Sequence, residues 1–161
     1  MMIAGFARAE PYEKHQEKST MTAEEMWNQS GLTGEYDAWS FGDDADTLAR
    51  LVKDGIKTAT CSAYCFYELE EEELPEAGAY NIILDSDEQA VCITRTTKVY
   101  VTPFSQVTAE HAFKEGEGDR SLAYWREVHK RFFTEELKEA DLEFDEDMKL
   151  VCEEFEAVYT G

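Results

Sequence analysis

The stretch Gly55-Ile56-Lys57-Thr58-Ala59-Thr60 is the most informative part of this chain. It follows residues 44–54, whose apolar side chains recur with the period of a helix. Glycine commonly ends a helix in the left-handed conformation, because it has no Cβ to clash there. A helix end of this kind fixes the direction of the residues after it. We therefore expect Lys57 and Thr60 to be held in defined positions just beyond a helix.

Two chemical roles are open to this lysine. It can bind an anion or, once desolvated, act as a base toward a nearby hydroxyl such as that of Thr60. The alternative is an ordinary solvated side chain, because most lysines beside turns lie on the surface. In a regular strand Lys57 and Thr60 would point to opposite faces. Their joint action therefore requires Lys57 to precede the strand, or the strand to bulge.

The charge of the chain restricts its partners. A formal net charge of −21 argues against binding along an extended nucleic acid, since the phosphates repel an acidic protein. The acidic residues are concentrated in residues 68–88 and 135–161, whereas residues 89–134 are slightly basic. These acidic blocks fit solvated faces that keep a protein soluble. A nucleoside or a short RNA end entering one local pocket is compatible with this distribution.

Length and composition indicate one globular domain. The chain has 161 residues, of which 43% are apolar. No segment approaches the roughly 20 apolar residues that cross a membrane, and the start lacks the basic region of a signal peptide. We therefore expect a cytoplasmic protein without a membrane partner. The sequence does not indicate the oligomeric state of the protein.

The cysteines and histidines carry no local metal-binding motif. The four cysteines are too few for a disulfide scaffold. Cys61 and Cys65 have three residues between them, and none of the three histidines has metal-ligand spacing on a shared helix face. From these spacings we expect no metal and no cofactor.

Polar composition without a clear helix or strand period predicts a poorly ordered extension at residues 1–21. The helix and strand signals after it predict a single α+β domain at residues 22–161. Strands of uneven length interrupted by short helices favour a small mixed or closed sheet over regular βαβ units. Two of the strands form a hairpin around the turn at residues 85–88. Helices are expected at residues 23–30, 44–54, 64–72, 110–114 and beyond 119, and strands at residues 38–41, 58–62, 80–84, 90–101 and 150–159.

A second candidate cluster lies at residues 110–120. Two glycines there predict a tight loop that can present Glu115 into a cleft, with Glu117 close by. Both carboxylates also fit a solvated surface, and we expect Asp119 to cap the following helix. Arg120 is a candidate phosphate ligand, although arginines on helices usually pair with acids.

Aromatic residues supply candidate stacking surfaces. Trp39, Phe41 and Trp125 could each pack on a nucleobase, an interaction worth about 1–3 kcal/mol per base. Aromatic residues at these spacings more commonly belong to a core. We assign Trp125 and His129 to the apolar stripe of an amphipathic helix.

Four motifs occur in order along the chain: Trp39-Ser40-Phe41-Gly42, then Gly55-Ile56-Lys57-Thr58-Ala59-Thr60, then Glu115-Gly116-Glu117-Gly118-Asp119-Arg120-Ser121-Leu122-Ala123-Tyr124-Trp125-Arg126, then Val151-Cys152-Glu153-Glu154-Phe155. Together they resemble the ASCH domain family, over about residues 27–159, and most closely its larger bacterial branch. The resemblance implies a PUA-like small mixed β-barrel with flanking short helices. It also implies a cleft for RNA or a nucleotide-like ligand.

One branch of this family consists of amidohydrolases that remove the acetyl group from N4-acetylcytidine. The resemblance carries their catalytic lysine, threonine and glutamate onto Lys57, Thr60 and Glu115, with Glu117 as the alternative acid. Thr60 would attack the acyl carbonyl, neutral Lys57 would accept its proton, and protonated Glu115 would donate to the departing nitrogen. This mechanism needs a lowered pKa at Lys57 and a raised pKa at Glu115. Burial favours both shifts, and mutual attraction opposes both.

Other functions remain open from the sequence. A non-catalytic module for RNA or a nucleotide would bind phosphate through Lys57 and Arg120. It would stack a base on Trp39 or Phe41 and read a base edge with Glu115. A ribonuclease would cleave RNA, and a protein-interaction domain would use the acidic faces.

Overall fold

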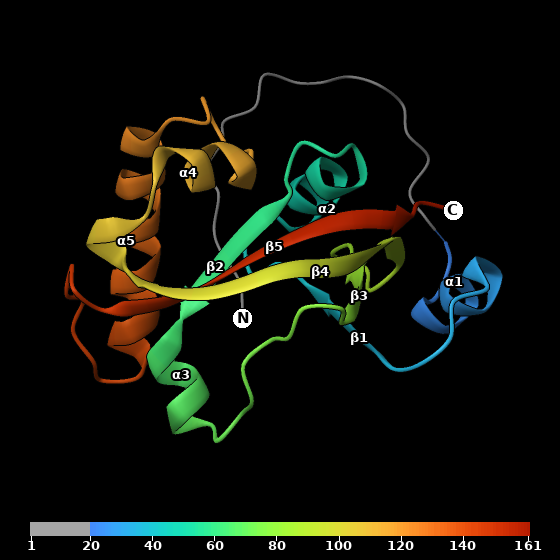
Figure 1. The fold of residues 1–161 in the computed structure, drawn as a ribbon, viewed down its shortest axis with the longest axis horizontal. Coiled ribbons are helices and arrows are strands. Elements are labelled where there is room, and N and C mark those ends of the chain that lie inside the picture. Colours follow the sequence, from blue (N-terminus) through green and yellow to red (C-terminus); the bar gives the residue numbers. More distant parts are fainter. Residues whose placement is uncertain (1–19) are drawn as a thin grey trace.

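The structure, a computed structural model, describes residues 20–161. The extension predicted at residues 1–21 therefore lies almost wholly outside the described residues. The described residues form five strands and five α-helices, whose arrangement is shown in Figure 1. The strands are β1 (Tyr36–Ser40), β2 (Ala59–Ala63), β3 (Tyr80–Leu84), β4 (Ala90–Pro103) and β5 (Lys149–Tyr159). The helices are α1 (Ala23–Ser30), α2 (Ala45–Lys53), α3 (Tyr64–Leu69), α4 (Ala109–Glu115) and α5 (Leu122–Glu139).

The strands form one mixed sheet in the order β1-β3-β4-β5-β2. β1 runs parallel to β3, and the other neighbours are antiparallel. The register between the long strands β4 and β5 shifts at Ile93/Thr94 and at Thr96/Lys98. Such bulges bend a strand and increase its twist, so the sheet curls into half a barrel. The predicted α+β fold with a small mixed sheet is confirmed, with β1 and β2 as the two edges of the described sheet.

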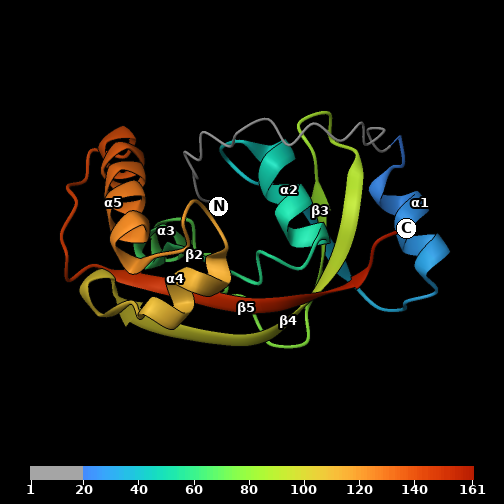
Figure 2. The same ribbon diagram turned by 90° about the horizontal axis from the view of Figure 1, so that it is seen from above.

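The helices lie around this curled sheet. Figure 2 shows α5 and α1 toward opposite ends of β4 and β5, with α2 between them. Three clusters of buried apolar side chains join helices to strands: one includes α5, β2 and β5, one includes α2, and one includes α1. Phe41, a member of the cluster with α2, lies with its ring centroid 5.4 Å from Lys57 Nζ.

Most predicted boundaries agree with the structure, and the hairpin of β3 and β4 is confirmed. The capping box that opens α1 is also confirmed, with Glu25 N–H donating to Thr22 Oγ1. The prediction that Asp119 caps α5 is wrong. Ser121 is the cap, because its Oγ accepts the N–H of Tyr124, and Asp119 instead accepts the N–H of Ser121.

Two further features of residues 20–161 bear on function. Within this range, none of the helices combines the length and the apolar character needed to cross a membrane. The four cysteines are free thiols, and Cys61, Cys92 and Cys152 are buried.

Candidate functional site

The end of α2 sets the position of Lys57. Gly55 has a φ of 73°, and the N–H of Ile56 donates to the carbonyl of Leu51 at 2.9 Å. This is the Schellman arrangement expected of a glycine-terminated helix. The N–H of Lys57 reaches the same carbonyl at 3.0 Å, and β2 begins only at residue 59. Lys57 therefore precedes the strand, which is one of the two conditions for joint action with Thr60.

The segment after Lys57 is fixed between α4 and β5. Thr58 N–H donates to the carbonyl of Lys114 at 2.7 Å, and Thr58 O accepts the N–H of Phe155 at 2.9 Å. Gly116 ends α4 with a φ of 73°, directly against Ile56. A Cβ on Gly116 would lie 2.5 Å from the carbonyl oxygen of Ile56. The missing side chain therefore lets the end of α4 approach the turn that carries Lys57.

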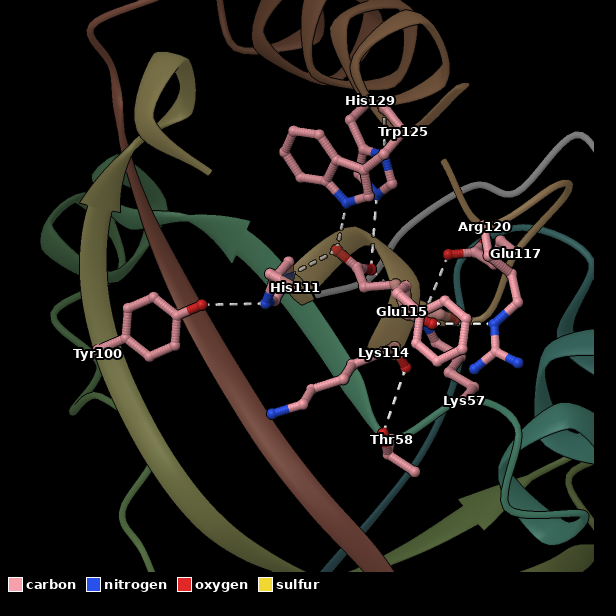
Figure 3. A network of polar contacts seen from close by, with 11 residues as sticks. Lys57, Thr58, Tyr100, His111, Lys114, Glu115, Glu117, Arg120, Trp125 and His129 are labelled. Carbon is pink, nitrogen blue, oxygen red and sulfur yellow. Dashed lines mark hydrogen bonds and ion pairs between the residues drawn. The ribbon is translucent and has the colours of Figure 1, made fainter. Parts of the chain in front are cut away.

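A buried carboxylate, that of Glu115, lies at the centre of a polar network (Figure 3). Its Oε1 is 3.3 Å from Lys57 Nζ and 3.5 Å from His129 Nε2. Its Oε2 accepts a hydrogen bond from His111 Nε2 at 2.8 Å and another from the indole N–H of Trp125. Lys57 precedes β2, Glu115 and His111 lie on α4, and Trp125 and His129 lie on α5. Three separate parts of the chain therefore converge on one carboxylate.

A second carboxylate completes the surroundings of Lys57. Glu117 Oε2 is 3.2 Å from Lys57 Nζ, which also lies 3.4 Å from the main-chain oxygen of Glu115. The ring of Phe41 lies 5.4 Å from the ammonium and forms an apolar wall beside it. Glu117 Oε1 and Thr60 Oγ1 are buried, and neither has a hydrogen-bond partner among the described residues. Beside Lys57, the Glu117 carboxylate thus has a buried oxygen with unused hydrogen-bonding capacity.

Electrostatic interactions decide the charge states of these groups. Burial alone would lower the pKa of Lys57, but attraction by Glu117 and Glu115 outweighs burial and raises it. Burial alone would raise the pKa of Glu115, but interactions with His129, Lys57 and His111 bring it well below its ordinary value. For Glu117, burial dominates over Lys57, and the pKa is raised. In the resting protein Lys57 is an ammonium and Glu115 a carboxylate, opposite to the forms that the predicted hydrolytic mechanism needs.

Thr60 lies on β2, opposite Glu153 of β5. The next residue, Cys61, has its Sγ within 4.8 Å of donor atoms of Glu115 and His129. Because side chains alternate along the regularly paired β2, Thr60 leaves the strand on the other face. The structure therefore brings Lys57 and Glu115 together, and none of the described contacts joins Thr60 to either of them.

Trp39 and Phe41, two of the residues predicted to stack on a nucleobase, pack against each other. The rings of Trp39 and Phe41 meet edge to face at 4.9 Å. The half-buried indole of Trp39 donates to Asn81 Oδ1 at 2.9 Å. Phe41 is 3% exposed and belongs to the core cluster with α2. In this conformation its ring contributes to the core and to the wall beside Lys57.

Arg120, the predicted phosphate ligand, bridges two parts of the site. Its Nε donates to the carbonyl of Phe113 at 3.0 Å, and its Nη2 donates to the carbonyl of Ile56 at 3.3 Å. Its guanidinium also stacks on the ring of Phe113, at 3.7 Å from the centroid. These contacts hold the end of α4 to the turn before Lys57, and this role was not foreseen from the sequence.

The spacing of the two histidines in the sequence indicates which residues they can meet on their own helices. His111 and Glu115, like Trp125 and His129, are spaced i,i+4 and therefore share a helix face. The rings of Trp125 and His129 stack at 4.2 Å with an interplanar angle of 15°. Both are buried, which confirms that this stripe of α5 is core. Only the tertiary contact between α4 and α5 turns the two pairs into one network.

Comparison with known families agrees with this architecture. The ASCH domain model matches residues 37–159, and this match covers most of the chain. This protein belongs to the ASCH domain family. The ASCH domain of Lactobacillus crispatus is 34% identical, with a TM-score of 0.79, over 83% of this chain and 92% of that one.

A second solved structure is also similar. A protein of Enterococcus faecalis is 44% identical, with a TM-score of 0.71, over 80% of this chain and 78% of that one. A search of curated proteins gives no match. The predicted membership of the ASCH family, and with it the PUA-like fold, is therefore confirmed.

Proposed function

We propose that this ASCH domain binds a nucleobase, presented as a nucleoside or at the end of a short RNA, beside Glu117 and Lys57. The unused hydrogen-bonding capacity of Glu117 supports this proposal most directly. Its Oε2 pairs with Lys57, but its buried Oε1 has no hydrogen-bond partner among the described residues. Such an atom costs about 1–3 kcal/mol, and native proteins rarely leave one unsatisfied. An N–H group of a ligand would remove this cost.

Nucleobases offer a suitable donor. A carboxylate accepts well from the exocyclic N4 amino group of cytosine, and uracil has no amino group at that position. An aromatic surface lies close by, because Tyr124 packs so tightly on Gly118 that a Cβ there would lie 2.3 Å from its ring. A base whose amino group reaches Glu117 could pack on this half-buried ring. The expected ligand is therefore a cytosine-type base.

The different exposure of the site residues indicates the side from which a ligand would approach. Lys57 and Glu115 are 1% and 0% exposed, whereas Glu117 is 5% exposed. The ligand would approach from the Glu117 side and displace part of the loop at residues 116–120. A small ligand also suits the charge, because only a local contact is needed.

Calorimetric titration with cytidine, N4-acetylcytidine and uridine tests the proposal. Cytidine should bind more tightly than uridine, and Glu117→Gln should weaken cytidine binding by about tenfold or more, equivalent to about 1.4 kcal/mol. Glu127→Gln changes an exposed carboxylate of α5 and serves as the matched control. Equal affinities for cytidine in wild type and Glu117→Gln, or no binding of any of the three nucleosides, would reject the proposal.

A second candidate function is hydrolysis of an N4-acylated cytidine. The buried Thr60 hydroxyl, which has no hydrogen-bond partner among the described residues, favours it. Because Thr60 leaves β2 on the face away from Cys61, this function requires Thr60 and Lys57 to come together when the substrate binds. Thr60 Oγ would bond to the acyl carbon and pass its proton to Lys57, which must first have lost one. The carbon–N4 bond then breaks, and N4 takes a proton from Glu117. Water hydrolyses the acyl-threonine. Glu117 suits the acid role better than Glu115, because both oxygens of Glu115 already accept hydrogen bonds.

Chromatography of N4-acetylcytidine incubated with the protein tests this second function. Wild type should release cytidine and acetate, and Thr60→Val should abolish release while retaining nucleoside binding. Intact N4-acetylcytidine after incubation with wild type that binds the nucleoside would exclude hydrolysis and leave the binding function standing.

A further inference from the structure

We infer that Cys61, Glu115 and His129 form a binding site for a divalent cation of the zinc type, on the core side of the Glu115 carboxylate. Each residue comes from a different element: β2, α4 and α5. One donor atom from each, a thiol sulfur, a carboxylate oxygen and an imidazole nitrogen, lies within 4.8 Å of the others. All three side chains are buried. This inference does not depend on the proposed nucleoside binding.

His129 provides an observation independent of the clustering. Its Nδ1 lies 2.7 Å from the carbonyl oxygen of Trp125, so Nδ1 carries a proton and donates it. In the neutral ring, Nε2 then has a free lone pair. This nitrogen is buried without a hydrogen-bond partner among the described residues, and Glu115 Oε1 lies 3.5 Å from it. A carboxylate oxygen and an imidazole lone pair that face each other in a buried place are stabilised by a cation between them, which is either a metal ion or a proton on Nε2.

The surroundings of His129 are those of a metal-bound histidine. Such a histidine usually donates its other N–H to a carbonyl or carboxylate, which fixes the tautomer and the ring orientation. The carbonyl of Trp125 plays this part, and the stacked indole holds the imidazole plane. The Glu115 carboxylate is oriented in the same manner, since His111 and the indole N–H of Trp125 both bond to Oε2. Oε1 therefore faces the proposed cation.

Lys57 is the group that opposes a cation here, because its ammonium shares Oε1 of Glu115 at 3.3 Å. It does not depend on that oxygen alone. Its ammonium also lies 3.2 Å from Glu117 Oε2 and 3.4 Å from the main-chain oxygen of Glu115. These two contacts can hold Lys57 when Oε1 turns toward a cation.

The donor set selects the class of cation. Thiolate and imidazole suit zinc and its spectroscopic substitute cobalt, whereas magnesium and calcium prefer oxygen ligands. Zinc bonds of about 2.0–2.3 Å place tetrahedral donors roughly 3.3–3.8 Å apart. The donor atoms lie within 4.8 Å of one another, so they need to close by up to about 1.0–1.5 Å to reach this geometry. Three protein ligands leave a fourth position for water.

Titration of metal-free protein with Co²⁺ tests the site. Wild type should bind one equivalent with the absorption of a thiolate-ligated tetrahedral cobalt, and Zn²⁺ should abolish that absorption. Mg²⁺ at the same concentration should leave it unchanged. Cys61→Ser should lose the thiolate band, and His129→Gln should lower cobalt affinity by tenfold or more.

Two controls keep the result interpretable. Cys92→Ser removes another buried thiol, one in the cluster with α2, and should bind cobalt as wild type does. Titration of the folded wild type does not depend on any variant. If wild type forms no tetrahedral cobalt complex, the inference is overturned. If folded Cys61→Ser keeps the thiolate band unchanged, the inference is also overturned. Nitrogen NMR that shows His129 protonated on both ring nitrogens after zinc addition would identify a proton as the cation and would also overturn it.

Discussion

Lys57 Nζ lies 3.3 Å from Glu115 Oε1, and both side chains are fully buried although they are 58 positions apart in the sequence. Burying an ammonium is costly unless it is paired and hydrogen-bonded. Here Glu117 supplies a second carboxylate at 3.2 Å. Lys57 is therefore a structural cation of the domain as well as a candidate site residue.

Replacing Lys57 should destabilise the fold strongly. Lys57→Met keeps most of the side-chain volume but leaves two buried carboxylates without their ammonium. Breaking a buried pair by removing one partner costs about 3–5 kcal/mol. Urea unfolding monitored by circular dichroism should show this loss. Lys53→Met changes an exposed lysine of α2 and should stay within about 0.5 kcal/mol of wild type.

This expectation changes how Lys57 variants are interpreted. A loss of activity in Lys57→Ala reports on folding as well as on chemistry, so Thr60 and Glu117 are the better positions for functional tests. If Lys57→Met unfolds at the same urea concentration as wild type, the ammonium is not needed to stabilise the two carboxylates.

Gly116→Ala should destabilise more than Gly31→Ala. The two glycines have nearly equal φ angles, 73° and 72°. Each substitution therefore incurs the left-handed penalty of about 1–2 kcal/mol. At Gly116 the new Cβ would also lie 2.5 Å from the carbonyl oxygen of Ile56, whereas at Gly31 no atom lies within 4 Å. Thermal unfolding of the two variants measures the difference, and equal losses would show that the contact with Ile56 relaxes without cost.

Glu136 should give the domain a pH-dependent stability near neutrality. Burial raises the pKa of this carboxyl to about 7, and its Oε2 has no hydrogen-bond partner among the described residues. The folded pKa lies above the unfolded value, so folding favours the protonated form. The destabilising effect of Glu136 is therefore absent below about pH 4.5 and increases as the pH rises through 7.

Glu136→Gln should remove this effect. At pH 8 the variant should be more stable than wild type by about 1–2 kcal/mol, a figure reduced because the carboxyl is partly exposed. At pH 5 the two proteins should unfold alike in urea. Glu135→Gln, at the exposed neighbouring position, should show no such pH dependence. A stability difference that is the same at pH 5 and pH 8 would contradict the raised pKa.

The ion pair between Lys114 and Glu154 should contribute little, although it connects α4 to β5. Its atoms are 2.6 Å apart, but the two side chains are 35% and 19% exposed. A double-mutant cycle with alanine at both positions should give a coupling free energy of about 0.5 kcal/mol that decreases in 1 M salt. A coupling above about 2 kcal/mol would show that this pair, and not the buried network, holds α4 in place.

Local signals in the sequence predicted much of the backbone. Gly55 and the helical period before it predicted the end of α2, and the turn at residues 85–88 predicted the hairpin. These features depend on interactions between neighbouring residues, which a single sequence displays directly. Asp119 and Ser121 mark the limit of such reasoning, because either residue can accept the hydrogen bond of an N-cap. In the structure Ser121 is the N-cap, because its Oγ accepts the N–H of Tyr124.

By itself, the sequence determined that Lys57 follows a glycine-capped helix end and that Glu115 lies at a tight glycine turn after a short helix. The tertiary structure alone decided that these two side chains meet in a buried place, and that Glu117, His129 and Cys61 join them there. Charge state and ligand geometry depend on distances between elements far apart in the chain. Local spacing carries no information on those distances, because they are set by how α4 and α5 pack on β2 and β5.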